Sequence, residues 1–135
     1  MLGFLRNSKL LMSPNHWKKL QAIAEAEVAT TLKSLPRELH AQAEKLPVTF
    51  EPRPNRRLVS EGVEPDTLGL FVGPEFAEEG MAPMPSQIIL FLENILDLAE
   101  GDEEFFREEI RTTLLHELGH YLGLDEDELT GRGLE

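Results

Sequence analysis

The first regular pattern of hydrophobic positions runs from Pro14 to about Leu35, where apolar side chains recur every three or four residues. This spacing puts them on one face of a helix, so it predicts a long amphipathic helix. Ser13 is a suitable N-cap with proline at the first helical position, and Pro36 ends the pattern. The segment 37–45 is expected to form a second, short helical turn.

The middle of the chain alternates short apolar runs with polar stretches rich in proline and glycine. The runs Pro47–Pro52 and Leu68–Gly73 are predicted strands, and the polar stretches Arg53–Asp66 and Pro74–Pro85 are predicted loops. The run Gln87–Leu92 begins with β-branched residues, which favours a third strand. That strand lies either in the core or at a sheet edge, where it could pair with an extended peptide.

A second long helix is predicted in the C-terminal part of the chain, after a helical turn at 93–98. Asp102 is its expected N-cap, its apolar positions continue to Leu122, and Gly123 stops it. The sequence contains no internal repeat and no linker between two cores. We therefore expect residues 12–135 to form one small α+β domain with a three-stranded sheet, and residues 1–11 to be an N-terminal extension.

Composition narrows the possible functions of the 135-residue chain. Thirteen basic and twenty-five acidic residues give a formal charge of −12, which disfavours binding to nucleic acid. Cysteine is absent, which excludes disulfides, thiolate metal sites and thiol nucleophiles. No apolar run approaches the roughly 20 residues of a membrane helix, and polar residues interrupt the N-terminal apolar stretch where a secretory signal would be continuous. A cytoplasmic protein is the expectation; the oligomeric state is left open.

One motif contains the residue types of a metal site: the sequence HELGH at residues 116–120, on the predicted C-terminal helix. His116 and His120 are four residues apart, so both imidazoles can point at one metal ion from one helix face. Glu117 is rotated by about 100° and can reach a water on the metal without binding the metal itself. Gly119 costs about 1 kcal/mol in mid-helix relative to alanine, which indicates a close approach of another segment there.

This donor set suits one Zn²⁺ ion per chain, because catalytic zinc sites use three nitrogen or oxygen ligands and one water. Zinc lowers the pKa of that water, and Glu117 is predicted to take its proton as general base. The resulting hydroxide would attack a peptide carbonyl that zinc polarises. The expected partners are therefore peptide or protein substrates.

The third ligand is predicted among the four acids that follow Gly123, at positions 125–128. The spacing from His116 through Gly123 to Glu126 resembles the metzincin pattern H-E-x-x-H-x-x-G-x-x-H/D, although all four methionines precede the motif and a Met-turn is impossible. If the chain is extended after Gly123, Glu126 has both the spacing and the reach to bind zinc. Asp125 is the alternative, and Asp127 and Glu128 could cap a following turn.

The layout from Met12 to Leu129 resembles a small bacterial family of minimal zincin-like metallopeptidases. The resemblance rests on two apolar strands and on the helix that carries the motif: Leu68–Phe71, Gln87–Phe91 and Thr113–Leu124. It implies a zincin-like α+β fold and a peptidase activity, without defining a substrate. The family usually has aspartate where this chain has Glu126.

Other residues have plainer interpretations. His16 and His40 are expected to be surface or packing histidines, and Tyr121 a core residue, because it points about 100° away from His120. Arg56 and Arg57 are expected to be solvated, although a substrate carboxylate could bind them. Two alternatives to a peptidase stay open: a zinc-binding interaction or regulatory module of the same fold, and a structural protein without metal.

Overall fold

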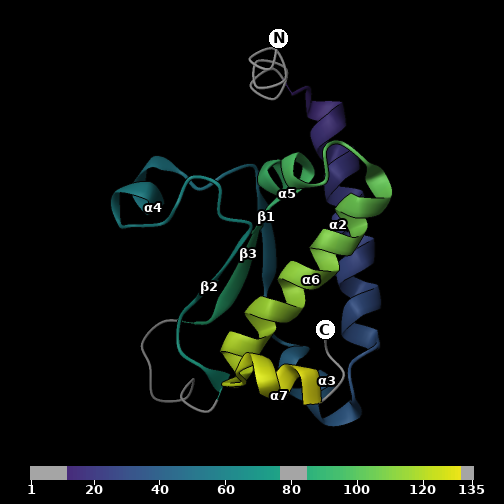
Figure 1. Ribbon diagram of the computed structural model, residues 1–135, viewed down its shortest axis with the longest axis vertical. Coiled ribbons are helices and arrows are strands. Elements are labelled where there is room, and N and C mark those ends of the chain that lie inside the picture. The colour runs from purple at the N-terminus through teal and green to yellow at the C-terminus, as the bar shows by residue number, and fades with distance from the viewer. Residues whose placement is uncertain (1–11, 77–84, 132–135) are drawn as a thin grey trace.

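A computed structural model describes residues 12–76 and 85–131, apart from the side chains of Glu126 and Thr130. Six helices and three strands make up this part of the chain (Figure 1). The helices are α2 (Pro14–Lys33), α3 (Arg37–Ala43), α4 (Arg56–Ser60), α5 (Leu92–Leu98), α6 (Glu103–Leu122) and α7 (Glu126–Gly131); the strands are β1 (Val48–Glu51), β2 (Gly69–Val72) and β3 (Gln87–Phe91). The predicted α+β class, with a small mixed sheet and a long C-terminal helix that carries the motif, is confirmed. The proposed extension at residues 1–11 lies outside the described residues.

Local capping signals determine where the two long helices begin. The Ser13 side chain accepts a hydrogen bond from the backbone N–H of His16 at 3.1 Å, and Pro14 opens α2. Asp102 accepts one from the N–H of Phe105 at 3.0 Å at the start of α6. Each side chain satisfies a backbone donor that has no partner within its helix. Both predicted N-caps are confirmed.

The sheet has the strand order β1-β3-β2, so β3 is its central strand. It runs parallel to β1, with Val48 opposite Ile88, and antiparallel to β2, with Leu70 opposite Ile89. The interpretation of this run as core is confirmed, and the alternative of an edge that pairs with a peptide is wrong because both edges of β3 are occupied. Within the described part of the chain, β1 and β2 are the edge strands.

The polar stretch 53–66 is not the simple loop that its composition predicts, because it contains the short helix α4. Asn55 caps this helix by accepting the N–H of Leu58 at 2.8 Å. Asparagine is among the best N-cap residues, so one local hydrogen bond is enough to start a turn in an otherwise polar stretch. The helix projects to one side of the molecule, away from α6 (Figure 1).

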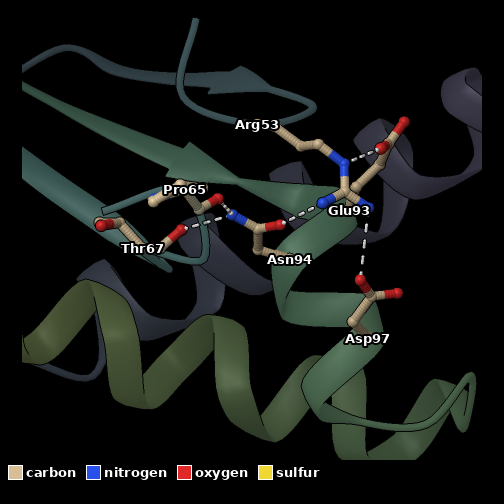
Figure 2. A network of polar contacts seen from close by, with 6 residues as sticks. All are labelled: Arg53, Pro65, Thr67, Glu93, Asn94 and Asp97. Atoms are coloured by element: carbon tan, nitrogen blue, oxygen red, sulfur yellow. Dashed lines mark hydrogen bonds and ion pairs between the residues drawn. The ribbon is translucent and has the colours of Figure 1, made fainter. Parts of the chain in front are cut away.

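A polar network fixes this connection to α5 (Figure 2). The guanidinium of Arg53 donates to Glu93 Oε1 at 2.8 Å and to Asn94 Oδ1 at 3.2 Å. The Asn94 side-chain amide in turn donates to the carbonyl oxygens of Pro65 and Thr67, at 2.8 and 2.9 Å. Because Asn94 is buried, these bonds satisfy groups that water does not reach. The network holds the chain where it enters β2.

Helix α6 is the centre of the fold. It packs against α2 on one side and against β2 and β3 on the other, as Figure 1 shows. The core between these layers includes fully buried large apolar side chains: Phe106, Ile88, Leu90, Leu92, Ile95, Ile110 and Leu114. Burial of this kind stabilises a fold by about 1.5–3 kcal/mol for each side chain. No helix among the described residues is long and apolar enough to cross a membrane.

Candidate metal centre

The C-terminal end of α6 is built by a glycine in the left-handed conformation. Gly123 has φ 72° and ψ 26°, and the N–H of Leu124 donates to the carbonyl of Gly119 at 2.8 Å. This arrangement closes the last turn and reverses the chain. The predicted end of the helix is confirmed, and it places the HELGH motif in the final two turns.

The structure brings His116, Glu117 and His120 together at this end of the helix. Their candidate ligand atoms all lie within 4.8 Å of one another, and the two imidazole ring centroids are 4.8 Å apart. Glu117 Oε1 lies 3.3 Å from Nδ1 of His120, and 10% of the Glu117 side chain is exposed, against 52% for His120. The prediction that the two histidines share one helix face is therefore confirmed. Two exposed nitrogen donors beside a carboxylate match the ligand chemistry that zinc prefers.

The buried position of Glu117 depends on Gly69 in β2. A Cβ atom at Gly69 would lie 2.6 Å from Thr113 Cγ2 and 3.3 Å from Glu117 Cγ. The missing side chain therefore lets β2 approach α6 closely enough to cover the part of the Glu117 side chain around Cγ. This role of Gly69 is absent from the sequence-based predictions, although a glycine inside a strand pattern is a known sign of close packing.

Gly119 gives the second close approach. A Cβ atom there would lie 2.8 Å from Cδ1 of Leu129, a buried residue of α7. Helix α7 therefore packs against the last turns of α6 (Figure 1), and Leu129 lines the same pocket as His116 and His120. The prediction that another segment lies against Gly119 is confirmed, and Leu129 is the residue that makes the contact.

The segment after Leu124 is helical and not extended, which corrects the geometry that favoured Glu126 as the third ligand. Asp125 Oδ1 accepts the N–H of Glu128 at 2.8 Å, and Glu128 Oε1 accepts the N–H of Asp125 at 3.0 Å. This reciprocal pair is a capping box, and it starts α7 at Glu126. Capping by Glu128 is confirmed. The side chain of Glu126 lies outside the described residues, so its role as a ligand stays a prediction.

A pocket of about 560 Å³ adjoins the two histidines. Its walls come from β2, the segment after β2, the end of α6 and α7: Phe71, Glu75, His116, Gly119, His120, Gly123, Leu124, Asp125 and Leu129. The cavity is large enough for a side chain of a bound peptide next to the histidine nitrogens. Glu75 belongs to a stretch predicted as an ordinary loop, because nothing local to that stretch indicates that it lies against the end of α6.

The remaining histidines have other positions. His40 Nδ1 lies 2.9 Å from the carbonyl oxygen of Leu32 and so joins α3 to α2. His16 is exposed near the start of α2. Among the described residues, neither belongs to a group that could hold a metal ion. Their interpretation as packing and surface residues is confirmed.

Tyr121 is a core residue, as predicted, and Arg56 and Arg57 are exposed on α4. The Tyr121 ring makes edge-to-face contacts with Phe71 and Phe76, each with ring centroids 5.8 Å apart. Arg57 pairs with Glu61 of its own segment, at 3.3 Å. These aromatic contacts connect α6 to β2 and to Phe76 in the segment that follows β2.

A family model described as zincin-like metallopeptidase matches residues 43–134. The match covers more than half of the chain and includes the whole sheet, α6 and α7. The protein therefore belongs to the zincin-like metallopeptidase family. Membership implies zinc as the metal and proteins or peptides as substrates. No curated protein matches the chain significantly.

Proposed function

We propose that this protein is a zinc-dependent peptide hydrolase that binds one zinc ion per chain. The observation that carries the proposal is the cluster of two exposed histidines and a buried glutamate beside a pocket, on a helix that the zincin-like family match includes. A purely structural metal site would have no use for Glu117, which is positioned next to the histidines and kept from most solvent. We further propose that residues 12–135 act as one domain, since α2 packs against α6 although the family match begins after it.

Each residue of the motif has a distinct role in this proposal. His116 and His120 hold the metal through ring nitrogens, and Glu126 at the start of α7 supplies the third ligand. Bound zinc supplies Lewis acidity, which lowers the pKa of water and polarises a carbonyl group. Glu117 accepts the proton of the attacking water and holds it for the leaving amine. Because β2 packs against the Glu117 side chain, the carboxylate can keep its orientation and does not have to reorganise during the reaction.

The substrate is proposed to lie along β2. This strand is an edge of the described sheet, and Phe71 from β2 lines the pocket beside the histidines. An extended peptide can add to such an edge through backbone hydrogen bonds, with alternate side chains entering pockets. This arrangement would bring a peptide bond past the motif without any additional domain.

The test is cleavage of a mixture of unstructured peptides, followed by mass spectrometry. We expect new fragments when the protein is loaded with zinc, and none after a chelator has removed the metal. Fragments that form equally well without metal would contradict the proposal. Zinc-loaded protein that cleaves nothing in a broad peptide mixture would instead favour a zinc-binding module without catalysis.

A separate prediction concerns the third ligand. Glu126→Gln is expected to weaken zinc binding by at least about 10-fold, the lower end of the loss for a residue that only supports a ligand, because a neutral amide is a poorer zinc ligand than a carboxylate. Asp125→Asn is expected to have a smaller effect on zinc affinity, since Asp125 already accepts the N–H of Glu128 in the capping box. Zinc titration of both variants checks this. A larger loss in Asp125→Asn than in Glu126→Gln would assign the ligand to Asp125.

A further inference from the structure

Glu75 is the acidic residue of the pocket that neither the motif nor the capping box uses. It follows β2, and its Oε1 atom lies 3.2 Å from the position that a Cβ atom would occupy at Gly123. Glu75 is exposed, and its carboxylate lies next to the C-terminal end of α6, on the same pocket as His116 and His120. Glu117 faces His120, and Asp125 is bonded to Glu128, so these acids already have partners.

Among the described residues, no contact of the fold stabilises a carboxylate in this place. The C-terminal end of a helix carries a partial negative charge, which disfavours a nearby anion by about 0.3–1 kcal/mol. Within the described part of the chain, no ion pair or hydrogen bond involves the Glu75 carboxylate, and no lysine or arginine lines the pocket. The Glu75 carboxylate gives this pocket a negative charge, which attracts a cationic group from outside the chain.

The other walls of the pocket are apolar. Phe71, Leu124 and Leu129 line it together with Glu75. A lysine or arginine side chain suits this combination, because its aliphatic stem packs on apolar surface while its charged head pairs with a carboxylate. An apolar side chain of similar length would pack on the same walls, but it would leave the Glu75 carboxylate without a positively charged partner.

We propose that Glu75 is a specificity-determining residue, which binds a lysine or arginine side chain of the substrate next to the cleaved bond. This inference rests on the proposed peptidase function and names its substrate class: peptides with a basic residue at one position near the metal. Glu75 acts on recognition and not on the proton transfer assigned to Glu117.

The test measures peptide binding without turnover, in the zinc-loaded Glu117→Gln protein. Fluorescent hexapeptides carry either lysine or norleucine at each position in turn; norleucine keeps the aliphatic stem and removes the charge. At one position we expect the lysine peptide to bind about five-fold more tightly, which is the upper end for a pair that is partly exposed to solvent. Adding Glu75→Gln is expected to remove this preference.

Glu108→Gln is the matched control, because it removes the same charge from an exposed position of α6 outside the pocket. It should retain the preference for lysine. The inference is overturned if no position favours lysine, if the preference survives Glu75→Gln, or if Glu75→Gln loses zinc and so proves to be a metal ligand. Cleavage by the wild type without a preference for lysine would overturn this inference alone. A preference that depends on Glu75, in a wild type that cleaves nothing, would overturn the peptidase alone.

Discussion

Glu117→Gln is expected to lower kcat/KM for peptide cleavage by at least about 100-fold while the protein still binds zinc. The amide has nearly the same shape as the carboxylate but cannot accept the proton of the attacking water. Glu117 is mostly buried where β2 packs on α6. Since the amide has nearly the same shape, the change should leave the packing around Gly69 and Thr113 intact. Initial rates on a peptide that the wild type cleaves, together with the zinc content of both proteins, provide the measurement.

Glu108→Gln serves here too as the control for a lost negative charge, and it should cleave at the rate of the wild type. A Glu117→Gln protein that retains zinc and most of its activity would remove Glu117 from the role of general base. Loss of zinc from Glu117→Gln would show instead that the residue contributes to metal binding.

The combined change of His116 and His120 to alanine is expected to have the largest effect on the metal. It removes both nitrogen donors, so zinc affinity should fall by more than the roughly 10- to 100-fold that follows from losing a residue which merely supports a ligand. Peptide cleavage should be lost with it. The fold should persist, since both histidines are exposed and the core of α6 lies on its other faces. Circular dichroism and thermal unfolding check that the fold is retained.

His16→Ala is the matched control for this pair, because His16 is an exposed histidine outside the metal cluster. Its zinc affinity should equal that of the wild type. If the double variant cleaved peptides as well as the wild type, the catalytic centre would have to lie elsewhere.

The parts of the structure that the sequence predicted well are those that local signals determine. Ser13 and Asp102 cap their helices through bonds that span three residues, and Gly123 ends α6 by its own conformation. The pairing of His116 with His120 on one face follows from helical periodicity alone. For these features, the neighbouring residues in the sequence are also the neighbours in space.

The features that escape prediction from the sequence depend on segments that are far apart along the chain. The contact of Gly69 with Glu117 and that of Glu75 with the end of α6 arise only after β2 has packed beside the helix. No periodicity within either stretch encodes that contact. The position of β3 between two partners likewise depends on the topology of the whole sheet.

Helix α7 differs from these features, because its signal is present in the sequence. Asp125 and Glu128 have the spacing of a capping box, which predicts a helix start. The prediction of an extended segment includes capping by Glu128 but overlooks the capping role of Asp125, which it treats only as a candidate ligand. From the sequence alone, this spacing indicates that Asp125 and Glu128 cap a helix, and it therefore distinguishes them from Glu126 as candidate ligands.

Equilibrium titration of the metal-free wild type with zinc tests the central claim most directly, with the His116→Ala, His120→Ala double variant measured beside it. We expect one zinc ion per chain of wild type, and no binding by the double variant over the same concentrations. Titration detects the site even when purification has removed the metal. A wild type that binds no zinc, or a double variant that binds as much as the wild type, would contradict the assignment of this helix end as the metal centre.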